Sequence, residues 1–175
     1  MEPMTVRVEV WPVAADDVGI WLVGGGDAWR NTLPVMADSE PHAEVELLLS
    51  QHSARDSVTW LHSTSWRPEG TSVMLTYLAA LRTSGPVRVE WPDALPVSPD
   101  LLSAVGKPFP HAADAPPVPR HIDVLLHGLG HMATLTAPGR DATTAAALTG
   151  HWTQHLTAFE PTVAGMYSER HSAMP

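Results

Sequence analysis

The stretch "LPVMADSEPHAEVELLLSQHSA", residues 33–54, joins a proline-containing loop to an apolar run and decides the fold. Asp38 and Ser39 stand just before Pro41, and a proline suits the first turn of a helix. The residues that follow are mostly apolar or helix-forming until polar residues return near His52–Arg55. The pattern predicts one short helix over 41–52.

Strands are predicted on both sides of this helix. Val6, Val8 and Val10 alternate with Arg7 and Glu9, and this period of two is typical of a half-buried strand whose polar face is solvated. Apolar runs bounded by turn residues predict further strands at 18–26, 57–66, 71–82 and 86–91. The turn signal "RPEG" at 67–70 predicts that the strands next to it form an antiparallel hairpin.

The composition of the chain changes after residue 106. "KPFPHAADAPPVP" at 107–119 is rich in proline, which fixes φ and removes backbone donors, so an extended surface linker is expected. Helical periodicity over 120–137 and 141–160 predicts an antiparallel helical hairpin around "PGR", and one helical turn is expected near 99–105. We therefore expect an α/β fold in three parts: an α/β domain over 1–106, the linker, and a C-terminal helical hairpin over 120–175 packed on the first domain.

Composition narrows the classes of partner. The formal charge of −9 and the single lysine, Lys107, argue against nucleic acid, because such affinity comes from clustered Lys and Arg. No apolar run reaches the roughly 18 residues that a membrane span requires, and the first residues predict a strand and no secretion signal. The absence of cysteine favours a cytoplasmic location. A small-molecule or protein partner is expected, without nucleic acid or membrane.

Several residues around the early helix resemble a known family. Trp29, the pair Leu33-Pro34, Glu40 and "AEVEL" at 43–47, ahead of a strand hairpin, are similar to the Nudix hydrolases. That family places a loop-helix-loop box between the strands of an α/β/α sandwich. The resemblance covers about residues 5–91 and implies a Nudix-like mixed sheet sandwich with one early helix.

The chain departs from the family's box where the chemistry is most demanding. Glu46 matches a glutamate of the box, but Val45 stands in place of an arginine and His52 in place of a glycine. Leu49 and Ser50 occupy two positions that hold metal-binding glutamates in the family. Magnesium requires oxygen ligands in near-octahedral geometry, so these replacements predict a degenerate box without a metal or cofactor.

Two functions are compatible with this box. The first is a non-catalytic ligand-binding or regulatory module, and the second is a divergent pyrophosphohydrolase acting on a nucleoside diphosphate derivative. In the second, Glu46, Glu40 and Glu44 would be catalytic and would hold Mg²⁺. A third hypothesis is a protein-interaction module that uses the C-terminal helices.

Candidate ligand-binding residues cluster in two places. Trp and Arg side chains stack on planar bases, and Arg also binds phosphate, which favours nucleotide binding. The residues that carry this hypothesis are Trp29, Arg30, His62, Trp66 and Arg67. The alternative is that Trp60 and Trp66 pack into the core of an ordinary strand.

Two pairs of histidines are spaced four apart, His127 with His131 and His151 with His155. Such spacing places two imidazoles on one helix face, as zinc sites require. A helical wheel, however, places the first pair opposite the apolar stripe, beside Asp123. We therefore expect solvated helix faces and no metal site.

Overall fold

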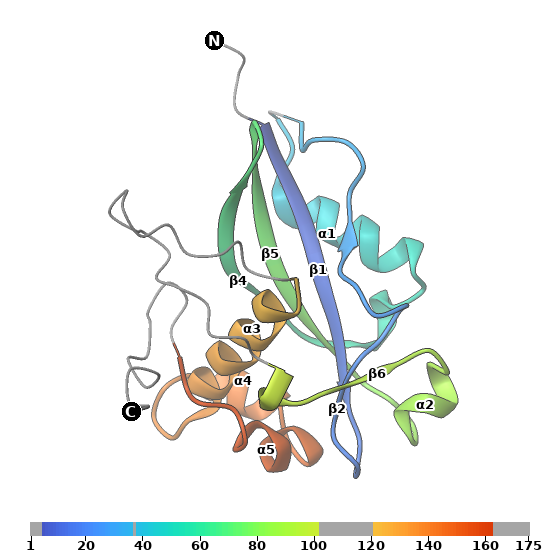
Figure 1. Ribbon diagram of the computed structural model, residues 1–175, viewed down its shortest axis with the longest axis vertical. Helices are drawn as coiled ribbons and strands as arrows, with labels where there is room; N and C mark the ends of the chain where they lie inside the picture. The colour runs from blue at the N-terminus through green and yellow to red at the C-terminus, as the bar shows by residue number, and fades with distance from the viewer. Residues whose placement is uncertain (1–4, 37, 102–120, 163–175) are drawn as a thin grey trace, which may run out of the picture.

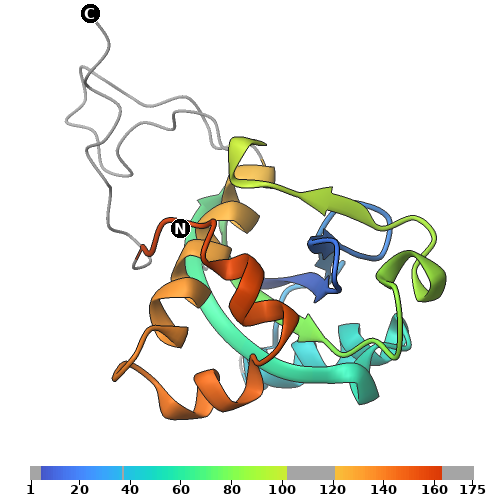
Figure 2. The same cartoon turned by 90° about the horizontal axis from the view of Figure 1, so that it is seen from below.

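The computed structural model describes residues 5–36, 38–101 and 121–162. Within these ranges the fold is mixed α/β, with a mixed sheet of six strands and five α-helices (Figure 1). Helix α1 covers one face of the sheet, whereas α3, α4 and α5 lie together on the other, as the view from below also shows (Figure 2). None of the helices in the described ranges is long and apolar enough to cross a lipid bilayer.

Strand β1 (Thr5–Ala15) is the centre of the sheet. It pairs in parallel with β5 (Ser72–Leu81) and antiparallel with β2 (Ile20–Leu22) and with the two-residue β3 (Trp29–Arg30). The main path of the sheet runs β4-β5-β1-β2-β6, where β6 is Leu95–Val97. Every residue from Val8 to Ala15 is buried, because helices cover both faces of the strand.

The predicted hairpin is confirmed, with β4 (Val58–Glu69) antiparallel to β5. Its turn lies at Gly70, where φ is +59°, so most of "RPEG" extends the strand. The register slips between Ser63 and Ser65, which marks a β-bulge around Thr64. A bulge reverses the faces of all residues beyond it.

The predicted early helix is confirmed as α1 (Pro41–Gln51), with proline in its first turn. Val45, Leu48 and Leu49 are buried in a core shared with Val8 and Val10 of β1. The N-cap is Glu40, slightly later than expected from the Asp38–Ser39 pair, and its side chain makes no capping bond. The helix is held by its apolar face.

The C-terminal helices differ in part from the expected hairpin. Helix α3 (His121–Thr136) matches the first predicted helix. The second divides into α4 (Ala142–Ala147) and α5 (His151–Leu156), because Gly150 between them has φ of +64° and interrupts the helical backbone. A large core joins these helices to the sheet; it contains Trp11, Val13, Leu78, Leu125, Leu129, Met132, Leu148, Trp152, Leu156 and Phe159.

The strand predicted at 86–91 is wrong. This segment forms the short helix α2 (Val87–Glu90), whose first amide donates to Asp16 Oδ2 over 2.8 Å. The helical turn expected after residue 98 is a 3₁₀ turn at Pro99–Leu101, and another such turn, Arg55–Ser57, connects α1 to β4. The linker predicted at 107–119 lies outside the described residues.

Candidate functional site

The three glutamates proposed for catalysis do not form one group. The Oε2 atom of Glu46 accepts a hydrogen bond from Arg55 Nε at 2.7 Å, and its other oxygen lies 3.8 Å from His42 Nε2. Glu40 is exposed at the helix start, and Glu44 is half-buried. No group of three or more acidic, His or Cys side chains in the described ranges is placed to hold a metal ion.

The positions that would complete a carboxylate cluster serve packing instead. Leu49 is fully buried, as is Val45. The hydroxyl of Ser50 donates to the backbone oxygen of Glu46, 2.8 Å away. Leu49 therefore contributes to the core and Ser50 bonds to the helix backbone, while Glu46 forms an ion pair with Arg55.

Two of the predicted ligand-binding residues, Arg30 and Arg67, converge on a buried glutamate. Glu9 is fully buried; its Oε2 atom lies 3.0 Å from Arg30 Nε and 2.8 Å from Arg67 Nη2. Its other oxygen accepts bonds from Arg67 Nη1, from Thr76 Oγ1 at 2.8 Å and from Trp11 Nε1 at 3.3 Å. Burial alone would raise the pKa of Glu9, but the hydrogen bonds and charge of Arg67, with Thr76 and Arg30, hold it at about 2.

This cluster corrects the expectation that Glu9 lies on a solvated strand face. The face that carries Glu9 and Trp11 is covered from the α3 side, and both residues are buried. A buried charge persists only when it is paired and hydrogen-bonded, and Glu9 meets both conditions. Arg67 is therefore engaged by Glu9 in a structural role and is not a free phosphate-binding group.

The two tryptophans of the nucleotide hypothesis do not face each other. Trp29 is buried beside α1 and stacks on His52, with ring centroids 4.1 Å apart. Trp66 is 61% exposed and pairs in register with Leu75, because the bulge turns it toward the α1 face and turns Arg67 toward Glu9. No ring contact joins these two tryptophans in the described part of the chain.

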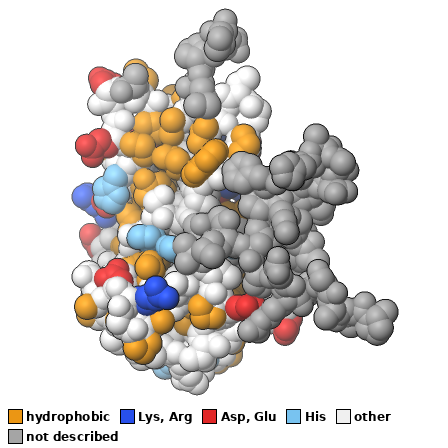
Figure 3. Space-filling model, turned by 90° about the vertical axis from the view of Figure 1, so that its left-hand side faces the viewer, with side chains coloured by type: hydrophobic (Ala, Val, Ile, Leu, Met, Phe, Trp, Pro, Cys, Tyr) orange, Lys and Arg blue, Asp and Glu red, His pale blue; other side chains and the backbone are white. Residues whose placement is uncertain are grey.

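Hydrophobic side chains gather on the side of the molecule where β4 lies, with histidines at the border of this area (Figure 3). His62, the remaining predicted ligand residue, stacks between Trp60 and His131, with ring centroids 5.3 Å from each. Its ring is therefore already in contact with two other aromatic side chains.

The expectation of a solvated face for the first histidine pair is wrong. His127 and His131 are half-buried and Asp123 is 4% exposed, because α3 lies close to the sheet at Gly128. Burial lowers the pKa of His127; burial, with the nearby His62 and His127, lowers that of His131. In the second pair, His155 Nε2 lies 2.9 Å from the backbone oxygen of Asp16, while His151 is exposed.

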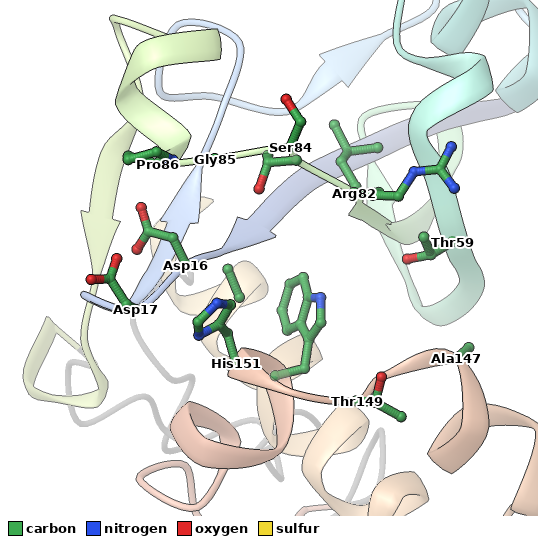
Figure 4. Close-up of a pocket in the computed structure, with 14 residues that line it drawn as sticks. Asp16, Asp17, Thr59, Arg82, Ser84, Gly85, Pro86, Ala147, Thr149 and His151 are labelled. Atoms are coloured by element: carbon green, nitrogen blue, oxygen red, sulfur yellow. The ribbon is translucent and has the colours of Figure 1, made fainter.

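A cleft with a volume of about 560 Å³ lies outside the carboxyl ends of the parallel strands β1 and β5 (Figure 4). Open α/β sheets commonly bind ligands at this kind of position. Residues that follow the two strands form one wall, and the segment joining α4 to α5 forms another. The polar residues that line it are Asp16, Asp17, Thr59, Arg82, Thr83, Ser84, Thr149 and His151.

Asp16 holds this end of the sheet together. Its Oδ1 atom accepts bonds from the amides of Val18 and Gly19 and from Trp21 Nε1, and Oδ2 accepts the amide of Val87. Burial raises the pKa of Asp16, but these four bonds outweigh that effect and lower it, so the side chain is anionic at neutral pH. The carboxylate adds a fixed negative charge to one wall of the cleft.

Sequence reasoning did not find this cleft. Asp16-Asp17 follows an apolar strand and precedes a glycine, a pattern that indicates a turn and carries no chemical signature. Arg82 lies 65 residues beyond Asp17 and follows a different strand, so the parallel pairing of β1 with β5 is needed to bring them to one cleft.

A comparison of the chain with protein-family models, with curated proteins and with solved structures finds no significant match. The resemblance to Nudix hydrolases therefore stays an interpretation of a few residues and of element order. A function for this chain therefore has to be inferred from the geometry of its own residues.

Proposed function

We propose that the chain is a non-catalytic binding module for a small ligand, built on a Nudix-like order of elements. The observation that carries the proposal is the state of helix α1. Its Glu46 forms an ion pair with Arg55, with Nε and Oε2 2.7 Å apart. One turn later, the side chain of Leu49 is buried and the hydroxyl of Ser50 donates to the helix backbone, so neither offers a metal ligand.

The rival hydrolase needs several carboxylate oxygens converging on one Mg²⁺ ion. Glu40, Glu44 and Glu46 would have to provide them, and Glu46 would first have to leave Arg55. Binding without turnover makes no such demand. It requires a lined cavity, and the cleft of about 560 Å³ falls in the usual size range of small-molecule sites.

The packing of the C-terminal helices argues against a separate interaction module that could be detached from the sheet. Leu125, Leu129 and Trp152 belong to the same core as Trp11 and Leu78 of the sheet. Removing α3, α4 and α5 would expose this apolar surface, so we expect the sheet not to fold without them.

Titration of the whole chain with Mg²⁺ by calorimetry, with and without ADP-ribose or UDP-glucose, tests the proposal. We expect no saturable binding of Mg²⁺ at millimolar concentration and no release of product from either compound. The variants are Glu46→Gln and, as a matched control, Glu69→Gln at the exposed end of β4. Turnover that requires Mg²⁺ and is lost in E46Q but not in E69Q would establish the hydrolase instead.

A further inference from the structure

The two ends of the cleft carry opposite charge. Asp16, Asp17 and His151 lie at one end, whereas Arg82 and Thr59 mark the other (Figure 4). We propose that the cleft binds a small zwitterion, a molecule with an ammonium group at one end and a carboxylate at the other. This inference rests on the proposed binding function and assigns its site and ligand class.

The acidic end can receive the ammonium group. Asp17 is exposed, and its carboxylate makes no hydrogen bond or ion pair with the described part of the chain. Asp16 beside it is ionised but has both oxygens occupied, so it contributes charge and not contacts. Two adjacent carboxylates on one wall create a negative potential that attracts a cation, and Asp17 has free oxygens to bind it.

The basic end can receive the carboxylate. Arg82 is exposed, and the one hydrogen bond of its side chain in the described ranges is long, 3.4 Å from Nη2 to the backbone oxygen of Asp56. No carboxylate within those ranges lies in ion-pair distance of its guanidinium. Arg67 differs in this respect, because both of its terminal nitrogens donate to the carboxylate of Glu9.

The rest of the lining suits a ligand with a mixed apolar and polar segment between its charged groups. Trp152 supplies a mostly buried apolar side chain to the lining, and the Thr149 hydroxyl is exposed and without a hydrogen bond in the described part of the chain. Ser84 contributes less, since its hydroxyl already donates to Glu90 Oε1 over 2.8 Å.

Charge favours a zwitterion over simpler ligands. A phosphorylated or dicarboxylate ligand would meet the negative charges of Asp16 and Asp17, in a chain whose formal charge is already −9. A purely cationic ligand would leave Arg82 uncompensated beside it. A ligand with one charge of each sign satisfies both ends.

Calorimetry or ligand-detected NMR with a length series tests this inference, using glycine, 4-aminobutyrate and 6-aminohexanoate as probes. We expect saturable binding of at least one of the longer zwitterions, at about 1 mM or tighter, and weaker binding of butyrate and butylamine. Arg82→Gln and Asp17→Asn should each weaken that binding about tenfold, which corresponds to about 1.4 kcal/mol, because each removes one charge-assisted contact with the ligand. Arg88→Gln, on the exposed surface of α2 outside the cleft, should leave it unchanged.

Binding of butyrate or butylamine as tight as that of the zwitterions would overturn the inference. So would absence of binding by all three zwitterions, or equal effects of R82Q and R88Q. These outcomes would not contradict the proposed binding function. That proposal is contradicted by Mg²⁺-dependent turnover, whereas this inference is contradicted by the choice of ligand.

Discussion

Glu9 and Arg67 are 58 residues apart in the chain, yet their side chains form a two-pronged ion pair inside the sheet. The pair exists because the bulge at Thr64 turns Arg67 toward the face on which Glu9 lies. Arg30 and Thr76 complete the bonds to the carboxylate. Arg30 and Arg67, first interpreted as ligand-binding, thus connect β3 and β4 to the central strand β1 through Glu9.

Replacing Glu9 with Gln should destabilise the protein strongly. The change removes the charge that compensates the guanidiniums of Arg30 and Arg67, and breaking a buried ion pair on one side costs about 3–5 kcal/mol. Urea denaturation followed by circular dichroism measures the loss. The exposed Glu40→Gln, whose side chain makes no capping bond, serves as control and should change the free energy of unfolding by less than about 0.5 kcal/mol. A loss below about 1 kcal/mol in E9Q would show that the cluster contributes little.

The same carboxylate gives the stability a defined pH dependence. The folded-state pKa of Glu9 is about 2, against an ordinary value of 4.5, so the unfolded chain takes up a proton first as the pH falls. The contribution of Glu9 is complete above pH 4.5 and is lost as the pH falls from 4.5 toward 2. The difference in unfolding free energy between the native chain and E9Q should shrink by about 3 kcal/mol over this window. A difference that stays constant would contradict the assignment.

Deleting Thr64 should remove the bulge and leave the faces of the later residues unchanged. Ser63 and Ser65 pair with the consecutive residues Tyr77 and Thr76, so a strand without Thr64 keeps Arg67 on the face of Glu9. Deleting Trp66 instead would place Arg67 opposite Leu75, on the face away from Glu9. We expect the Trp66 deletion to lower the unfolding free energy by at least about 3 kcal/mol, since Glu9 would lose a charge partner, and the Thr64 deletion to lower it less, as measured by urea denaturation. Equal losses in the two variants would contradict this register.

The elements that are amphipathic over many residues could be predicted from the sequence. The helix α1 and the β4–β5 hairpin follow from apolar patterning and turn residues alone. The segment 86–91 could not, since its apolar alternation fits a strand and it becomes helical where Asp16 binds the amide of Val87. Which of the candidate site residues lie together could not be predicted either, for a related reason. The sequence does not specify which strands are parallel neighbours or where a bulge reverses the faces.

The histidine stack between β4 and α3 should make stability fall on mild acidification. Burial, with His62 and His127, lowers the folded-state pKa of His131 below 6.5, so its contribution is complete above pH 6.5 and is lost as the pH falls below it. The charge of Asp141, which interacts with His62, acts in the opposite direction. His131→Phe keeps an aromatic ring against His62 and should reduce the loss of stability between pH 7.5 and 5.5, as thermal unfolding across this range would show. An unchanged pH profile would exclude His131 as the cause.

Two glycines of α3 allow a matched test of how this helix lies on the sheet. A Cβ at Gly128 would stand 3.7 Å from Leu78 Cδ2 and Thr64 Cγ2, which is ordinary van der Waals contact. A Cβ at Gly130 would come within 2.8 Å of the backbone oxygen of Glu160. Gly128→Ala should therefore stabilise the protein by about 0.5–1 kcal/mol through helix propensity, whereas Gly130→Ala should destabilise it.

Both substitutions bring the same gain in helix propensity, so the difference between them isolates the packing around α3. Urea denaturation of the two variants gives this difference directly, and it should exceed about 1 kcal/mol in favour of Gly128→Ala. Thr162 adds to the expected effect, because its Oγ1 atom also lies within reach of a Cβ at Gly130. If the two variants had equal stability, the segment at 160–162 would not be held against α3, and the contact of the Thr134 hydroxyl with Thr162 would be lost with it.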